Sequence, residues 1–275
     1  MTLGLVMVVA AFIGLCLFNL EPARFGAHHD DGIYVVTAKA LATGQGYRII
    51  SLPDRPAQTK YPPLYPFLLS LIWRVYPDFP GNLRPMLLLS AMTATLFLLA
   101  TYFYLTRQGH CGPVVALLIV GLMACNRRMI LFSGLLYSEL TYALLSLLAV
   151  WAAERCADGR RTWTGFLAGG LAGLACLTRT MGITRPAALA LYLLARRSYR
   201  PLAAVLLGAA LFIGPWHAWR RAQPPPKPTA SATYYTDYGA DFRDIVWEMR
   251  ACFGTWRPKT FITLPCYSRP PWCYP

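Results

Sequence analysis

Charged residues are scarce in this sequence, and acidic residues are the scarcest of them. Only 14% of the 275 residues are charged, and 26 Lys and Arg outnumber 12 Asp and Glu. Hydrophobic residues make up 56% of the chain and the mean hydropathy is +0.40. This composition excludes an ordinary soluble domain and predicts an all-α, polytopic membrane protein.

The excess of basic residues gives a formal charge of +14, which in a soluble protein would suggest nucleic-acid binding. Here the Lys and Arg lie in short loops between apolar runs, where anionic headgroups and the positive-inside bias explain them. We therefore expect membrane lipids as partners and no nucleic acid.

Paired metal ligands are also missing. The eight cysteines form no C-x-x-C pair, so zinc has no linear signature, and the three in the polar tail, Cys252, Cys266 and Cys273, cannot all pair with one another. His28 and His29 could join neighbouring aspartates in a metal site, but adjacent residues seldom direct both rings at one ion. We expect no obligatory metal or other cofactor.

Long apolar runs are abundant instead. Residues 1–20 are long enough to span a bilayer and lack a basic n-region and an A-x-A-type cleavage site, so they predict a retained helix. Hydropathy predicts about seven membrane helices in all, the others lying near 83–105, 112–125, 136–153, 163–178, 182–195 and 201–218.

The arginines of the short loops predict an orientation. With a cytoplasmic N-terminus, the inner loops hold seven arginines and the outer loops four. The inner set is Arg107, Arg155, Arg160, Arg161, Arg196, Arg197 and Arg200, and the outer set is Arg127, Arg128, Arg179 and Arg185. This orientation places the long first loop, 21–82, and the C-terminal tail on the outer face of the cell's inner (plasma) membrane.

Two short helices are expected in the first loop. The stretch "DDGIYVVTAKALATG" begins with an acidic cap and ends at Gly44. A second helix carries an apolar stripe on a segment too short to span, which predicts a helix along the membrane surface. The stripe consists of Leu64, Phe67, Leu68, Leu71, Ile72 and Val75. We therefore divide the chain into a membrane core, 1–221, and an irregular, proline-containing tail, 222–275.

Three acids are candidates for chemistry. Asp30 and Asp31 follow the first apolar run, where a carboxylate can reach both a lipid-borne and a water-soluble substrate, although an aspartate here is also an ordinary helix cap. Glu139 is the only acid between residues 79 and 153. Acids at such depth usually face a cavity or a partner, and the alternative is a helix cap formed with Ser138.

Three cations lie on the same predicted side. Lys60 precedes a Pro-Pro pair, whose fixed φ angles predict an extended segment, and Arg179 and Arg185 separate two apolar runs. Such cations can hold a phosphate. The alternatives are a lysine that snorkels beside Tyr61 and Tyr65 in an aromatic belt, and arginines that anchor a turn at the interface.

The order of these segments resembles the GT-C superfamily of membrane glycosyltransferases that use polyprenyl-phosphate sugars. The similarity is greatest to the branch of dolichyl-phosphate-mannose protein mannosyltransferases and lipid A aminoarabinose transferases. It extends over roughly residues 1–221, and it rests on "DDGIY", "KYPPLYPFLLSL", "YSELTYALL", "GLACLTRTMG" and "GPWHAWR" in that order.

The resemblance implies an inverting transfer of a sugar to an acceptor protein, glycan or lipid at the outer face. It implies that Asp30 is the catalytic base, with Asp31 as second candidate, that Lys60 and Arg179 hold the donor's phosphate, and that Glu139 lies in the site. Tyr61 and Arg185 complete the set of candidate substrate-binding residues. A lipid phosphate is a good leaving group, so cations can replace a general acid.

The chain is shorter than such enzymes usually are, and its last stretch does not continue their pattern, so we expect a truncated member. Two alternatives stay open, a non-enzymatic polyprenyl-lipid carrier or flippase, and an inactive fragment of a glycosyltransferase. A transporter that uses Glu139 is disfavoured, because the acids gather at one face and form no path through the membrane.

Overall fold

The computed structural model describes residues 2–26, 29–157 and 162–224. They belong to one unit, Met1–Thr236, whereas a second unit, Asp237–Pro275, lies outside the described residues. His28, the tail cysteines and nearly all of the predicted segment 222–275 therefore lie outside them as well.

The described part of the chain is all-helical, as the sequence predicted, and its only strand-like feature is an isolated bridge between Arg48 and Ala57. Two short 3₁₀ helices, Pro22–Arg24 and Thr180–Ile183, connect longer elements. The α-helices are α1 (Thr2–Phe18), α2 (His29–Ala42), α3 (Leu64–Val75), α4 (Leu83–Arg107), α5 (Pro113–Ala124), α6 (Arg127–Ser133), α7 (Glu139–Ala157), α8 (Thr162–Thr178), α9 (Thr184–Ala195) and α10 (Tyr199–Ala222).

All seven predicted apolar runs form helices, but only α4 and α10 are by themselves long and apolar enough to cross a membrane in the part of the chain described. A third candidate is the pair formed by α5 and α6, which are bent by 63° relative to each other. Helix α6 was not expected from the sequence. It begins where the side chain of Asn126 accepts hydrogen bonds from the backbone of Arg128 and Met129.

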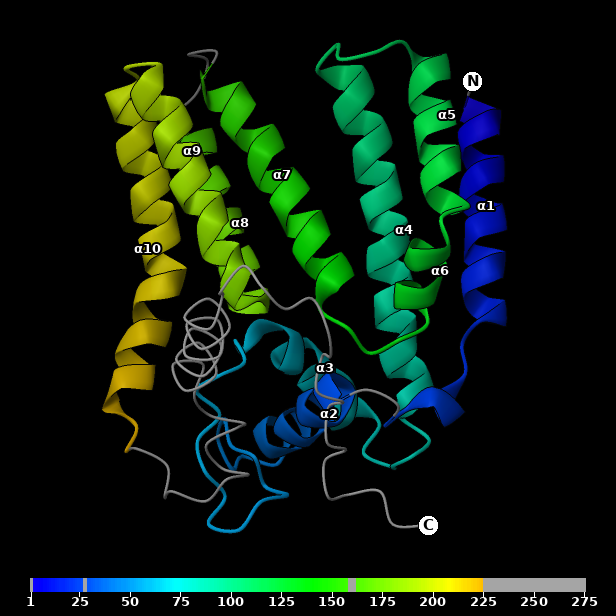
Figure 1. The fold of residues 1–275 in the computed structure, drawn as a ribbon, viewed down its shortest axis with the longest axis vertical. Coiled ribbons are helices and arrows are strands. Elements are labelled where there is room, and N and C mark those ends of the chain that lie inside the picture. The colour runs from blue at the N-terminus through cyan, green and yellow to red at the C-terminus, as the bar shows by residue number, and fades with distance from the viewer. Residues whose placement is uncertain (1, 27–28, 158–161, 225–275) are drawn as a thin grey trace, which may run out of the picture. The chain divides into compact units, whose positions relative to one another are not determined.

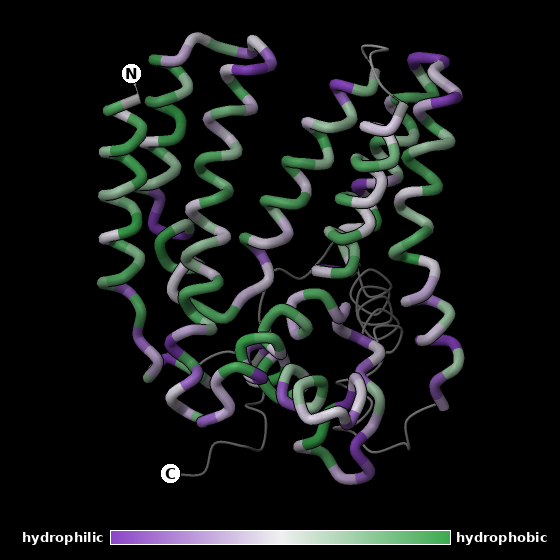
Figure 2. The backbone as a smooth tube through the Cα atoms, turned by 180° about the vertical axis from the view of Figure 1, so that it is seen from behind, coloured by the Kyte–Doolittle hydropathy of each residue, from purple (hydrophilic) through white to green (hydrophobic). Residues whose placement is uncertain are grey.

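The long helices run in alternating directions (Figure 1). One end of the bundle holds the start of α1 and the connections from α4 to α5 and from α9 to α10. The other end holds α2, α3 and the start of α7. Hydrophobic residues follow the long helices and hydrophilic residues gather towards their ends (Figure 2). This arrangement brings the predicted outer segments to one end of the bundle.

Helices α8 and α10 approach each other closely because glycines form the contact. Gly165, Gly169 and Gly173 repeat every fourth residue on one face of α8 and meet the backbone of α10. A methyl group at Gly208 of α10 would collide with the backbone carbonyl oxygen of Phe166. Small residues of this spacing let helices pack backbone to backbone in membranes.

The first-loop helices form where they were predicted, but α3 packs with an unexpected face. Gly44 ends α2 with a φ of 72°, a left-handed conformation that favours glycine. In α3 the residues packed against the protein include Tyr65, Leu69 and Trp73. Of the predicted stripe, Phe67, Leu71 and Val75 are exposed and form its outward-facing part, with Val75 86% exposed, whereas Ile72 packs against this core. The outward-facing stripe is the surface that a membrane-surface helix would turn to lipid.

Candidate functional site

Four segments that are distant in sequence meet at the end of the bundle that carries α2 and α3. They are the first turn of α2, the loop at residues 58–63, the start of α7 and the turn after α8. Their polar side chains form two connected groups, one around Asp30 and one around Glu139. The packing of α2 and α3 against the start of α4 holds the first group in place, with Tyr34, Tyr65 and Leu87 among the buried residues of this cluster.

The two neighbouring aspartates have different surroundings. Asp31 is 3% exposed, and its carboxylate oxygens accept hydrogen bonds from the backbone N–H groups of Gly26 at 2.9 Å and Gly32 at 2.6 Å. Asp30 is half-buried, and its Oδ1 accepts a hydrogen bond from the Tyr61 hydroxyl at 2.8 Å. Asp31 therefore stabilises the turn before α2 through backbone hydrogen bonds, whereas Asp30 bonds to the side chain of Tyr61.

Tyr34 links the two groups. Its hydroxyl shares a hydrogen bond of 3.1 Å with Ser138 Oγ, and its ring meets the Tyr61 ring edge to face at a centroid distance of 5.7 Å. Burial raises the pKa of Tyr34 far above its ordinary value, and the negative charges of Asp30 and Glu139 add to the rise. Tyr34 therefore keeps its proton and acts as a neutral hydrogen-bonding group.

Glu139 and Arg179 form an ion pair, in which Arg179 Nη1 donates to Glu139 Oε1 at 2.5 Å. The same nitrogen lies 3.5 Å from Ser138 Oγ. Burial lowers the pKa of Arg179, but the Glu139 carboxylate and Tyr34 outweigh it, so the net shift is upwards. The other oxygen, Glu139 Oε2, is buried and has no hydrogen-bond partner among the described residues. Glu139 thus has the cationic partner that an acid at this depth requires.

Lys60 is 5% exposed, which contradicts the interpretation as a snorkelling lysine. The loop around it is shaped by the fully buried Gln58, whose Oε1 accepts the backbone N–H groups of Lys60 at 2.9 Å and Tyr61 at 3.2 Å. These bonds fix the turn that directs the Tyr61 hydroxyl towards Asp30.

Tyr47 ties this loop to α10. Its hydroxyl donates to the backbone oxygens of Tyr61 at 3.0 Å and Pro62 at 3.2 Å. Its ring contacts Trp216 and Trp219, which stack on each other with a centroid distance of 5.2 Å. Tyr47 and the "GPWHAWR" stretch are therefore in direct contact, although almost the whole membrane core separates them in sequence.

Arg185 lies beside the ion pair. Its Nε donates to the Tyr142 hydroxyl at 3.2 Å, and its guanidinium lies 5.6 Å from the centre of that ring. Tyr142 follows Glu139 by three residues on α7, so Arg185 is about one helical turn away from the pair. The structure thus brings Asp30, Tyr61, Glu139 and Arg179 into one network, and it places Arg185 at the side.

Tyr34 and Tyr142 were not among the residues predicted for the site, and Ser138 was expected only as a helix cap. A signal for Tyr34 was present, since it follows Asp30 by four residues in a predicted helix and so shares its face. The hydroxyl of Ser138 joins Tyr34 to Arg179.

Comparisons with known protein families, curated proteins and solved structures found no match to this chain. Within the described residues, no three His, Cys, Asp or Glu side chains come together as a metal site would need. What the network offers is a half-buried carboxylate that accepts a tyrosine hydrogen bond, next to a paired arginine and a buried lysine.

Proposed function

We propose that this chain is an integral-membrane glycosyltransferase that moves a sugar from a polyprenyl-phosphate donor to a hydroxyl of an acceptor protein, glycan or lipid. The observation that carries the proposal is the placement of Asp30. Its carboxylate is held by Tyr61 beside the Arg179 cation, at the same end of the bundle as the outward-facing apolar stripe of α3. A lipid-borne donor and a polar acceptor meet at such a boundary.

In this reaction Asp30 acts as the general base. It removes the proton from the acceptor hydroxyl while that oxygen bonds to the anomeric carbon from the face opposite the phosphate. The bond between the anomeric carbon and the phosphate oxygen breaks, and the polyprenyl phosphate leaves with the electron pair. Tyr61 orients Asp30 through its hydrogen bond, and Asp31 keeps the turn of α2 in place.

The positive charges of Lys60, Arg179 and Arg185 stabilise the departing phosphate in this proposal. Glu139 balances Arg179 until the anionic donor arrives, because an unpaired guanidinium at this depth would be costly. We further propose that α1, the bent pair of α5 and α6, α4 and α7 to α10 make about seven crossings of the plasma membrane. The site then lies on the outer face.

The test is transfer of labelled sugar from polyprenyl-phosphate donors extracted from membranes, measured at equal expression of each variant. Asp30→Asn keeps an oxygen that accepts the Tyr61 hydrogen bond but cannot take a proton, so we expect transfer to fall by about 10²–10⁴-fold. The control is Asp78→Asn, which removes an exposed acid from the same first loop and should leave transfer unchanged.

Absence of transfer by the unaltered chain from every donor tested would refute the enzymatic function. A second candidate function is that of a lipid carrier. It is favoured by the ion pair of Arg179 with Glu139, because an arginine that exchanges between a carboxylate and a phosphate suits reversible binding. A carrier would bind and move the donor equally well with Asp30→Asn, so the same variant separates the two proposals.

A further inference from the structure

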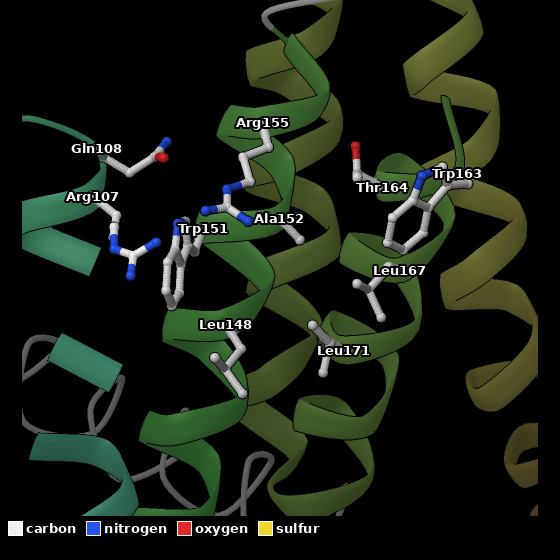
Figure 3. Close-up of a pocket in the computed structure, with 10 residues that line it drawn as sticks. All are labelled: Arg107, Gln108, Leu148, Trp151, Ala152, Arg155, Trp163, Thr164, Leu167 and Leu171. Atoms are coloured by element: carbon white, nitrogen blue, oxygen red, sulfur yellow. The ribbon is translucent and has the colours of Figure 1, made fainter. Parts of the chain in front are cut away.

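A cavity of about 720 Å³ opens between the end of α4, the second half of α7 and the first half of α8. It lies towards the end of the bundle that is opposite α2 and α3 (Figures 1 and 3). Its wall is apolar, with Leu148, Leu167 and Leu171, and its mouth is polar, with Arg107 and Arg155. None of the residues of the proposed transfer reaction takes part in it.

The mouth of the cavity carries two positive charges that the described residues do not balance. Neither Arg107 nor Arg155 forms an ion pair within the described part of the chain. Glu154, next to Arg155 in sequence, is bonded to side chains other than these two arginines, one of them the cavity-lining Gln108. It accepts hydrogen bonds from Tyr104 at 2.8 Å and Gln108 at 3.2 Å, and it lies 3.4 Å from His110.

The Trp151 side chain lies between the two arginines. Figure 3 shows its ring between the guanidinium groups of Arg107 and Arg155, and the Arg155 guanidinium lies 4.9 Å from the ring centre. The indole Nε1 is buried and has no hydrogen-bond partner among the described residues. The indole ring, and not its N–H group, therefore supports Arg155 at the mouth of the cavity through a cation–π contact.

We propose that this cavity binds a membrane lipid with a phosphate headgroup. The phosphate pairs with Arg107 and Arg155 at the mouth of the cavity, and a hydrocarbon tail follows the leucine wall. A lipid fits better than free phosphate, because the wall continues into a surface where Trp163 is 58% and Leu167 is 42% exposed. The site matches both parts of such a lipid, because guanidinium groups pair with the phosphate and the apolar wall packs against the hydrocarbon tail. This proposal is independent of sugar transfer.

The test measures binding of dioleoyl phosphatidic acid to the full chain in detergent by native mass spectrometry. The double variant Arg107→Gln/Arg155→Gln should weaken binding about tenfold or more, because it removes two charge-assisted contacts. The matched control, Arg196→Gln/Arg200→Gln, removes two exposed arginines of the same end that do not line the cavity. It should change the affinity less than about twofold, the effect expected of rim charges.

Two further measurements identify the ligand. Leu167→Trp fills the apolar part, so it should weaken phosphatidic acid binding but not binding of inorganic phosphate. Dioleoylglycerol, which has the tails without the phosphate, should bind about tenfold or more weakly than phosphatidic acid to the unaltered chain. The proposal is overturned if the arginine double variant and its control bind phosphatidic acid equally. It is also overturned if either inorganic phosphate or dioleoylglycerol binds to the unaltered chain as tightly as phosphatidic acid does.

Discussion

The contact between α8 and α10 gives the sharpest test of the structure. Gly208 of α10 faces the backbone of α8, so a methyl group there meets the carbonyl oxygen of Phe166 and the amide nitrogen of Gly170. Backbone atoms cannot rotate away as a flexible side chain can. Gly208→Ala therefore forces the two helices apart. Gly14 of α1 is the matched control, because a methyl group there meets nothing within 4 Å.

The expected difference follows from two opposing effects. Replacing glycine by alanine within a helix stabilises it by about 1 kcal/mol, and this gain applies at both positions. At Gly208 the collision adds a packing cost of about 1–3 kcal/mol. Because the gain in helix propensity is the same for both variants, it cancels, and their free energies of unfolding should differ by about 1–3 kcal/mol, with Gly208→Ala the less stable.

The assay is thermal unfolding of each purified variant in the same detergent, followed by tryptophan fluorescence. Gly208→Ala should unfold at a lower temperature than the unaltered chain, and Gly14→Ala at the same or a higher one. Equal unfolding temperatures for the two variants would refute the close contact of α8 and α10.

Three further predictions follow from the same structure. Asp31→Asn replaces one of the two carboxylate oxygens that accept backbone N–H groups, so it should lower the free energy of unfolding by about 1–3 kcal/mol in the same assay. Reduced sugar transfer at unchanged stability would contradict the structural role of Asp31. Burial, with Asp30 and Glu139 nearby, raises the pKa of Tyr137 to about 12, so its contribution to stability should be complete below about pH 10 and be lost as pH rises towards 12. In an ultraviolet titration, Tyr137→Phe should show one fewer tyrosine that titrates near pH 12 than the unaltered chain. Loss of a tyrosine that titrates near its ordinary pKa would contradict this prediction. Cys111, a free thiol in the turn between α4 and α5, should react with a membrane-impermeant maleimide only after cells are permeabilised, in a chain whose other cysteines are serine; labelling in intact cells would reverse the proposed orientation.

The site shows how far sequence reasoning extends. Asp30, Glu139 and Arg179 were selected because charged residues are conspicuous in an apolar chain, and Tyr61 was selected beside Lys60 as a candidate substrate-binding residue. Their pairing could not be read from the sequence, because 31 positions separate Asp30 from Tyr61 and 40 separate Glu139 from Arg179. The different surroundings of Asp30 and Asp31 were also hidden, since both fit the same helix-cap pattern.

The sequence by itself determined the α-helices other than α6, because hydropathy and the 3.6-residue period are local properties of the chain. It located all seven apolar runs and both first-loop helices. It did not determine which face of α3 packs inwards, because lipid and protein core are equally apolar and one pattern satisfies either. Only the tertiary structure decided that face, the glycine contact of α8 with α10, and the joining of four distant segments into one polar network. These depend on shape and on charge pairing between elements, and neither is a property of any single segment.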